Sequence, residues 1–530
     1  MRLLYYKIMN KNFFVHIFTR SSFFLYISLY ASAILLINFF VGFHQTHNDF
    51  WDIYFGIRHL SLSDTHSLYS PYFPIGYYLL LKLIAGHFPP EIPAIIVNVI
   101  FGFVFLAASA ILYNNILNRK TALWGIVFLS LCPRVFYYMQ VGGADPASMT
   151  FFALGTLVII NCLVQNVNNK NTIMFIGGLF MGCAAIFRYH AMVGSCMLLF
   201  SLLIVYRKEW PGLLFAGIGT FVVSLPQLVI YLLTSPHTVH FAVMNIYNLM
   251  YPLSWYHTIT LSLPSSALQL ITGDPLLFMK KYAAGIWQHA LVFIPPVLAV
   301  TFVKDSQKKR LCVALALFCV IYSLFFAAMT SNRSLLLPLS ISFLCAGMLA
   351  EEAICFISKR MHRKISLALI CSFILLTLCA FLMNDASKAA MRHKEHRVCL
   401  LVENYLHDKG CKSVRQIFST DFYLYFRSMP PCIPYFNGGA PRWATYLYNE
   451  EYPEFSDSTI KDFSEACHKR QVRFVILTEP CRERSQALGS LFDNPQSSPY
   501  FAFLKEIDRF RIFEVKNALF VALPGDEEQF

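Results

Sequence analysis

The chain has 530 residues, of which 56% are hydrophobic and 14% are charged, and its formal net charge is +13. Soluble domains contain about 25% charged residues, so this composition excludes an ordinary soluble enzyme and predicts a protein that crosses a membrane many times. The excess of lysine and arginine lies in short segments between apolar runs, where the positive-inside rule places it. We therefore expect contact with membrane lipids and no nucleic-acid partner.

The basic N-terminus leads into the first long apolar run, 21–43. A run of about 18 or more apolar residues can span a bilayer as a helix. This run is too long for the apolar core of a signal peptide, and no small-residue cleavage site follows it. We expect an uncleaved first helix with its N-terminus in the cytoplasm, and an outer loop at 44–90.

The outer loop begins with the short acidic stretch 44–54, which contains Asp49 and Asp52. A segment rich in proline and tyrosine, Ser70–Leu79, comes later in the same loop. The apolar piece 75–85 is too short to span a bilayer at about 1.5 Å of rise per residue. We interpret it as an interfacial or re-entrant helix, with the neighbouring tyrosines in an aromatic belt at the membrane boundary.

About eleven membrane helices are expected in all. The ranges with the clearest boundaries after the first helix are roughly 92–113, 121–140, 173–188, 287–303 and 365–383, with further spans between polar turns and a long outer segment at 236–285. Positions 304–310 and 359–364 each carry four Lys or Arg residues. The positive-inside rule places these two segments in the cytoplasm and thereby constrains the parity of the count.

Charged residues become frequent from about Asp385. The run 472–477 is typical of a buried strand, 510–515 of an alternating strand and 456–471 of an amphipathic helix. We expect a transmembrane catalytic module at 1–383 and an extracytoplasmic α/β domain at 384–530. The latter contains Cys399, Cys411, Cys432, Cys467 and Cys481. Disulfides are compatible with an extracytoplasmic location, but the sequence leaves their pairing open.

The polar residues at the predicted outer ends of the helices include carboxylates and arginines. Asp49, Asp145, Arg188 and Arg333 all fall there. Ionisable groups at the edge of a membrane are functional candidates, a carboxylate can act as general base toward a hydroxyl, and arginine binds phosphate with two hydrogen bonds. These residue types therefore indicate transfer chemistry at the outer face.

Five segments in chain order resemble the GT-C superfamily of membrane glycosyltransferases, which use polyprenyl-phosphate sugars. They are similar above all to bacterial relatives of protein O-mannosyltransferases and lipid A aminoarabinose transferases. The segments are Asp49 in the first outer loop, Ser70–Leu80 (with its prolines split as Pro71 and Pro74), Gly143–Ala147, Ala185–Tyr189 and Asn332–Pro338. The resemblance implies a polytopic α-helical membrane protein of GT-C type with a soluble C-terminal domain.

The resemblance also implies an inverting transfer of a sugar from a polyprenyl-phosphate carrier to a lipid, glycan or protein acceptor. The active site would face the outer side of the cytoplasmic membrane, and the C-terminal domain would be periplasmic. Asp49 would deprotonate the acceptor hydroxyl, and fixed cations or a divalent metal would support the leaving phosphate. The implied catalytic residues are Asp49 and Asp145, and the implied substrate-binding residues are Asp52, Tyr72, Arg188, Tyr189, Lys280, Lys281 and Arg333.

Simpler roles stay open for these residues. Asp49 can be a solvated residue at a helix exit, and Asp52 a helix cap. Asp145 precedes Pro146, a pattern typical of an N-cap. The arginines can extend to the membrane surface and the lysine pair can contact lipid headgroups. His44 and His47 could share a metal if their stretch were helical.

Three other functions stay open for the chain as a whole. A lipid or glycan transporter or flippase is the main alternative, although transporters place their sites near the bilayer midplane and often show internal repeats, and no repeat is evident here. A non-catalytic assembly protein of envelope polysaccharide synthesis is the second. The third is an oligosaccharide polymerase or ligase, which would use a lipid-linked glycan as its donor. The five segments that resemble the GT-C superfamily do not distinguish such an enzyme from a transferase that uses a monosaccharide carrier.

Overall fold

The computed structural model describes the chain in several ranges. These are residues 21–41, 74–84, 91–140, 143–165, 167–234, 267–328, 333–358, 397–420, 458–479 and 481–516, with 246, 249, 250, 394, 424, 435, 436 and 455. They fall into two compact units. The described part of the first unit is helical and ends at residue 358, and the second unit combines helices with a sheet.

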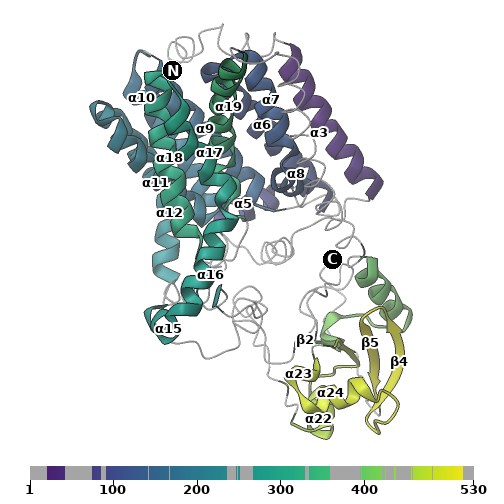
Figure 1. Ribbon diagram of the computed structural model, residues 1–530. Helices are drawn as coiled ribbons and strands as arrows, with labels where there is room; N and C mark the ends of the chain where they lie inside the picture. The colour runs from purple at the N-terminus through teal and green to yellow at the C-terminus, as the bar shows by residue number, and fades with distance from the viewer. Residues whose placement is uncertain are drawn as a thin grey trace. The chain divides into compact units, whose positions relative to one another are not determined.

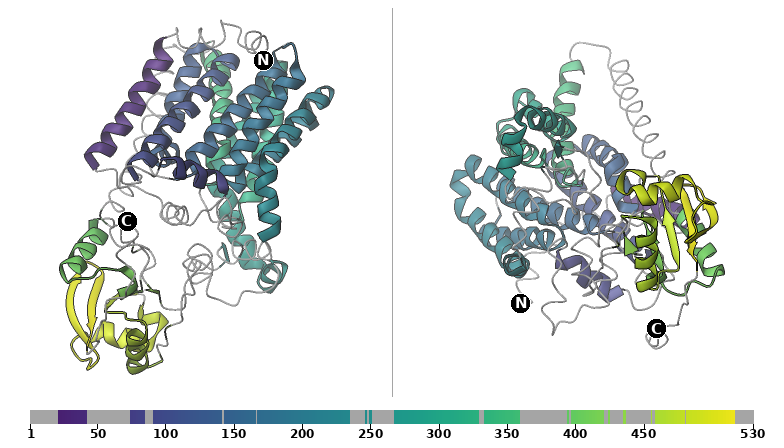
Figure 2. Two further views of the ribbon diagram at one scale, coloured as in Figure 1. Left: turned by 180° about the vertical axis from the view of Figure 1, so that it is seen from behind. Right: turned by 90° about the horizontal axis from the view of Figure 1, so that it is seen from below.

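The long helices of the first unit stand side by side as a bundle (Figures 1 and 2). Among the described residues, six helices are long and apolar enough to cross a membrane, and a seventh span results if a pair bent by 67° counts as one. The helices are α3 (Ser21–Val41), α5 (Ile75–Ile84), α6 (Glu91–Ile116), α7 (Arg119–Leu131), α8 (Pro133–Gln140), α9 (Asp145–Val164), α10 (Lys170–Phe187), α11 (Tyr189–Val205), η2 (Arg207–Glu209), α12 (Trp210–Thr234), α15 (Ala267–Gly273), α16 (Pro275–Gln288), α17 (Ala290–Phe302), α18 (Ser306–Phe326) and α19 (Leu336–Ser358).

Most of the expected helices are confirmed, including the short one at 75–85, but the continuous helix expected at 121–140 was wrong. The expected helix at 121–140 is broken at Cys132 into α7 and α8, because Pro133 has no N–H to continue the hydrogen-bond ladder and favours a helix start. The outer segment 236–285 contains α15 and most of α16. The expected helix at 365–383 lies outside the described residues, so the total of about eleven stays a prediction.

Glycines bring α10 and α12 into direct backbone contact. A Cβ at Gly178 would overlap the carbonyl oxygen of Ala216, and a Cβ at Gly182 would lie 2.7 Å from the carbonyl oxygen of Thr220. Small residues at such positions let membrane helices approach closely and gain van der Waals contact. Gly217, on the same helix α12, has no atom within 4 Å of its missing Cβ.

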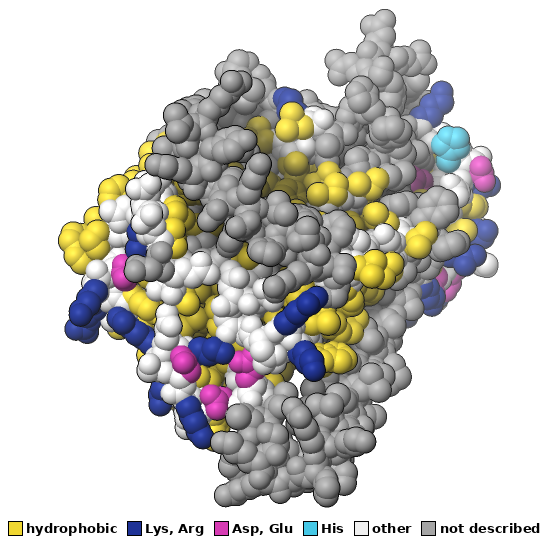
Figure 3. Space-filling view, turned by 90° about the horizontal axis from the view of Figure 1, so that it is seen from above, with side chains coloured by type: hydrophobic (Ala, Val, Ile, Leu, Met, Phe, Trp, Pro, Cys, Tyr) yellow, Lys and Arg dark blue, Asp and Glu magenta, His cyan; other side chains and the backbone are white. Residues whose placement is uncertain are grey.

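Polar turns that were expected to face the cytoplasm meet at one end of the bundle. The Glu351 carboxylate accepts a hydrogen bond from Asn118 Nδ2 at 2.6 Å and forms an ion pair with Lys308 Nζ at 2.8 Å. Arg310 Nη2 donates to the carbonyl oxygen of Val205 at 2.8 Å. Figure 3 looks onto this end, where Lys and Arg side chains lie among Asp and Glu. We call it the basic end, and α5 and α8 lie at the opposite end (Figure 1).

The second unit is built on a mixed five-stranded sheet in the order β2-β1-β3-β5-β4. β1 pairs in parallel with β2 and β3, and β5 pairs antiparallel with β3 and β4. The strands are β1 (Ile417–Ser419), β2 (Tyr435–Phe436), β3 (Phe474–Leu477), β4 (Phe501–Ile507) and β5 (Phe510–Val515). The helices are 397–408, α22 (Ile460–Lys469), α23 (Cys481–Arg484) and α24 (Gln486–Asp493).

Hydrophobic residues cover both faces of this sheet, which is why β3 is buried along its whole length as its apolar sequence predicts. β5 matches the expected range 510–515. The expected helix at 456–471 is shorter, because Thr459 caps α22 by accepting from Asp462 N. Four cysteines of this unit, Cys399, Cys411, Cys467 and Cys481, are free thiols, and Cys432 lies outside the described residues.

Candidate active site

A buried ion pair joins α9 to the junction of α10 and α11. Arg188 Nη2 lies 2.8 Å from Asp145 Oδ2, and Asp145 and Arg188 are only 2% and 7% exposed. The expected N-cap role of Asp145 is wrong. Ala144 is the N-cap of α9 and Asp145 is its first helical residue, so its carboxylate is directed to the guanidinium. Removing two charges from water is costly unless they pair with good geometry.

Arg188 lies between two helices with no linker on either side. It is the C-cap of α10 and also the N-cap of α11, with an extended backbone at φ −151° and ψ 129°. Its N–H donates to the carbonyl oxygen of Ala184 at 3.1 Å, and its carbonyl oxygen accepts from Ala191 N at 3.0 Å. The backbone of Arg188 is therefore fixed from both helices while its side chain reaches Asp145.

The short helix α5 places Tyr77 beside this ion pair. Tyr77 is 1% exposed, and both Asp145 and Arg188 act on it electrostatically. A Cβ at Gly76 would lie 2.7 Å from the carbonyl oxygen of Ile186, so α5 can lie against the end of α10 only because residue 76 is glycine. The expected aromatic-belt role of Tyr77 is therefore wrong, since this tyrosine is buried inside the unit.

Arg333 joins the same cluster from the turn before α19. Its side chain is hydrogen-bonded to Tyr138 on α8, and Tyr138 lies within electrostatic range of Asp145 and Arg188. The turn itself is held by the Tyr322 hydroxyl, which donates to the carbonyl oxygen of Ser334 at 2.6 Å. Two guanidinium groups and one carboxylate therefore gather at this end of the bundle.

His190 lies within electrostatic range of all three charges of the cluster, Asp145, Arg188 and Arg333. Its ring meets Phe326 of α18 edge-to-face, with 6.3 Å between the ring centroids. Without counting His190, the two arginines and Asp145 give the cluster a net charge of +1. A net positive charge, with donors from tyrosine and arginine, is suited to an anionic group such as phosphate.

The structure thus brings together three of the residues predicted from the sequence, Asp145, Arg188 and Arg333. Tyr189 follows Arg188 directly, and its hydroxyl accepts a hydrogen bond from Gln227 Nε2 at 3.0 Å. Sequence reasoning missed Tyr77, Tyr138 and Gln227 as members of the site, and it placed His190 at the same outer boundary without giving it a role. For Tyr138 and His190 the signal was their proximity in sequence to Asp145 and Arg188.

The other predicted site residues are not placed in this cluster. Lys280 is exposed and Lys281 half-buried on α16, and neither has an ion pair or hydrogen bond with any described residue, so their role in substrate binding stays a prediction. Within the described ranges no group of three or more His, Cys, Asp or Glu residues could hold a metal ion. Asp49, Asp52, Tyr72, His44 and His47 lie outside the described residues.

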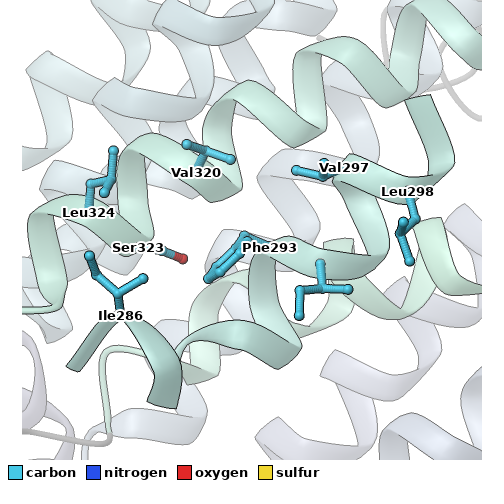
Figure 4. Close-up of a pocket in the computed structure, with 8 residues that line it drawn as sticks. Ile286, Phe293, Val297, Leu298, Val320, Ser323 and Leu324 are labelled. Atoms are coloured by element: carbon cyan, nitrogen blue, oxygen red, sulfur yellow. The ribbon is translucent and has the colours of Figure 1, made fainter. Parts of the chain in front are cut away.

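An apolar cleft lies between α17 and α18, beside the end of α16 (Figure 4). Its volume is about 330 Å³, at the lower end of the range of about 300–1,000 Å³ for ligand pockets. Ser323 contributes the only hydroxyl to a lining that otherwise consists of Ile286, Phe293, Ile294, Val297, Leu298, Val320 and Leu324. This cleft suits a hydrocarbon chain and has no group that could carry out acid–base chemistry.

Comparison with solved structures shows the fold. ArnT from Cupriavidus metallidurans bound to undecaprenyl phosphate aligns with 92% of this chain and 97% of its own, with a TM-score of 0.56 and 10% identity. Its apo state aligns over the same shares with a TM-score of 0.55. The chain has the fold of ArnT. The resemblance to GT-C glycosyltransferases is thereby confirmed at the level of the fold.

A looser likeness is found to the archaeal oligosaccharyltransferase AglB from Archaeoglobus fulgidus in complex with an inhibitory peptide and a dolichol-phosphate. It covers 94% of this chain and 75% of that chain, at 11% identity and a TM-score of 0.46. Comparisons of the sequence with protein families and with curated proteins find no match.

Proposed function

We propose that the chain is an integral-membrane glycosyltransferase that moves a sugar from a polyprenyl-phosphate carrier to a lipid, glycan or protein acceptor. The observation that carries this proposal is the net-positive cluster formed by the buried Asp145–Arg188 pair and the partly exposed Arg333, in a bundle with the fold of ArnT. The ArnT structure holds undecaprenyl phosphate, an anionic group on a long hydrocarbon chain. The cationic cluster suits the phosphate of such a molecule, and the apolar cleft between α17 and α18 suits its hydrocarbon chain.

The phosphate would be bound by the cationic cluster. As the sugar leaves the carrier, negative charge grows on the departing phosphate oxygens, and fixed cations stabilise that charge in the transition state. Arg333, held by Tyr138, and Arg188, held by Asp145, supply two such cations. Asp145 contributes by orienting Arg188, because a carboxylate paired with a guanidinium at 2.8 Å is a weak general base.

The hydrocarbon chain would enter the apolar cleft between α17 and α18. The cleft and the cluster lie on neighbouring parts of α18, since Ser323 and Leu324 line the cleft and Phe326 contacts His190. Ser323 and Phe326 are three residues apart, so they lie on the same side of α18 and are separated by about 4.5 Å along its axis. A single amphiphile could therefore bind with its phosphate at the cluster and part of its chain in the cleft.

Asp49 is proposed as the general base on the resemblance of its loop to the GT-C pattern. It would take the proton of the acceptor hydroxyl as the acceptor oxygen attacks the anomeric carbon. The carbon–oxygen bond to the carrier breaks at the same time, and its electron pair leaves with the phosphate. Attack from the opposite side inverts the configuration at that carbon.

The site is proposed to face the periplasm, with the N-terminus in the cytoplasm and the α/β unit periplasmic. The clustering of basic turns at the other end of the bundle supports this orientation. Mass spectrometry of envelope glycolipids and glycoproteins from a deletion strain tests the function. We expect a sugar modification to disappear and to return with the wild-type gene. Unchanged glycolipids and glycoproteins would contradict a transferase.

A further inference from the structure

Asn98 places a buried side-chain amide in the apolar helix α6. It is fully buried, and its Nδ2 donates a hydrogen bond to the carbonyl oxygen of Gly143 at 3.0 Å. A carbonyl oxygen can only accept, so the NH₂ group of the amide must face it. An asparagine inside a helix bundle is costly unless it binds a partner on a neighbouring segment. Here the partner lies two residues before Asp145.

The start of α9 has no side-chain cap of its own. Its N-cap is Ala144, which makes no side-chain hydrogen bond, and the carboxylate of the next residue, Asp145, is engaged in the ion pair. Pro146 has no N–H that could donate back to Gly143. Asn98 therefore holds, from α6, a helix start that a capping side chain usually holds.

Tyr77 connects Asn98 to the candidate site. This tyrosine interacts with the Asn98 side chain and with the backbone of Gly143. Asp145 and Arg188 act on the same tyrosine. The hydrogen bond between α6 and the start of α9 and the buried ion pair thus surround one side chain of α5.

The helix α5 is held by contacts that do not involve Asn98. The N–H of Ile75, its first residue, donates to Gln227 Oε1 on α12 at 2.7 Å. Removal of the Asn98 amide should therefore leave α5 in place and release the segment that precedes α9. The groups that would shift are the Asp145 carboxylate and, through it, the Arg188 guanidinium.

We propose that Asn98 is a positioning residue of the donor-phosphate site. It holds the start of α9 so that Asp145 orients Arg188 toward the phosphate of the polyprenyl donor. This donor is that of the proposed function, on which the phosphate-binding part of the role rests. Arginine binds phosphate with two parallel hydrogen bonds, which requires a defined orientation. Loss of the Asn98 amide weakens phosphate binding about threefold to tenfold, the effect of one neutral hydrogen bond.

The same two helices provide a matched control. Asn115, also on α6, donates through Nδ2 to Oδ1 of Asn161 on α9 at 3.1 Å. It lies about 25 Å from Asn98 along the helix axis, at about 1.5 Å of rise per residue. Asn98→Leu and Asn115→Leu each remove one hydrogen bond between α6 and the α9 segment. A purely structural role would therefore give both variants similar effects.

The experiment uses the full-length protein in lipid nanodiscs, with undecaprenyl phosphate as the probe. Affinity is measured by native mass spectrometry, and hydrogen–deuterium exchange is followed in peptides covering 75–84, 147–153 and 157–164. We expect Asn98→Leu to weaken binding about threefold to tenfold, to accelerate exchange at 147–153 and to leave 75–84 unchanged. Asn115→Leu should bind like the wild type and accelerate exchange only at 157–164.

Combination with arginine variants identifies the route by which Asn98 acts. Arg188→Lys keeps the charge but loses the planar, two-pronged donor group. Asn98→Leu should weaken binding no further in the Arg188→Lys background. In the Arg333→Lys background it should weaken binding by its full factor. Asn98→Ala, measured alongside, removes the same amide without the methyl groups of leucine.

Three outcomes would each overturn the positioning role. They are wild-type affinity in both Asn98 variants, an equal loss in Asn115→Leu, and a full further loss in the Arg188→Lys background. If the wild type fails to bind undecaprenyl phosphate, the proposed donor is wrong. Exchange at 147–153 still decides, in that case, whether Asn98 holds the start of α9, and unchanged exchange in the Asn98 variants would show that it does not.

Discussion

Asp145 and Arg188 are 43 positions apart in the sequence, yet their side chains form a buried 2.8 Å ion pair. Because both side chains are buried, each charge is neutralised by its partner and not by solvation. Each depends on its partner more than an exposed charge would, because a buried charge without a counter-charge is strongly destabilising.

Breaking this pair should therefore destabilise the helical unit. We expect Asp145→Asn to lower the free energy of unfolding by about 3–5 kcal/mol, measured by denaturant-induced unfolding in detergent micelles. The double variant Asp145→Asn/Arg188→Gln should recover part of the loss, since it leaves no uncompensated charge. Glu465→Gln is the control, because the Lys461–Glu465 pair is exposed and exposed pairs contribute about 0–1 kcal/mol. Fully additive single effects would contradict the coupling.

Asp49→Asn should abolish sugar transfer and leave the protein folded in the membrane, because an amide cannot take up the proton of the acceptor hydroxyl. The checks are turnover with purified protein and complementation of the deletion strain. The amount of membrane-inserted protein serves as the folding control. Wild-type turnover in Asp49→Asn would show that this carboxylate is not the base.

Two glycines of the bundle should respond oppositely to the same substitution. Gly178→Ala places a methyl group against the Ala216 carbonyl oxygen, and such overpacking costs about 1–3 kcal/mol. Gly217→Ala adds a methyl group where no atom lies within 4 Å. It should be neutral or stabilise α12 by up to about 1 kcal/mol, since alanine loses less backbone entropy than glycine in a helix. Equal thermal stability of the two variants would disprove the backbone contact.

The α/β unit should lose stability in alkali through Cys411. This residue is 1% exposed, and burial raises the pKa of its thiol from 9.0 to about 12. The unfolded thiol ionises first, so the stabilising contribution is complete below about pH 9 and is lost as the pH rises toward 12. Alkylation by iodoacetamide at pH 8 should accordingly be slow at Cys411 until the unit unfolds, and faster at the half-buried Cys399.

A single mass-spectrometric time course compares the two cysteines, with Cys411→Ala as the reference for the pH dependence of unfolding. Rapid alkylation of Cys411 in folded protein, or the same alkaline midpoint in Cys411→Ala and wild type, would refute the assignment.

Hydropathy and charge were sufficient to predict most of the membrane helices, the end at which the basic turns meet and the ranges of β3 and β5. These features depend on local sequence, because apolar length and lysine content decide them directly. The motifs around Asp145, Arg188 and Arg333 also predicted a shared location. The break at Cys132 was missed because the first half of the run 121–140 is apolar throughout. Its hydropathy predicts one continuous helix even though Pro133 interrupts it.

The contacts that assemble the site could not be predicted in the same way. Gln227 lies within an apolar run and is 152 positions from Ile75, so no local pattern indicates that it faces α5. Tyr77 is one of several tyrosines near a membrane boundary, and only the close approach at Gly76 shows that it points inward. Partner choice between helices depends on three-dimensional packing, and a single sequence carries little information about it.

The junction at Arg188 also limits what insertions this chain can accept. α10 ends at Phe187 and α11 begins at Tyr189, so a single extended residue connects the two helices. No loop between them could accommodate an inserted residue. An extra residue within the first turn of α11 would rotate everything after it by about 100°, turning its buried face toward lipid. We expect natural variants of this chain to vary in length elsewhere and to keep this junction at one residue.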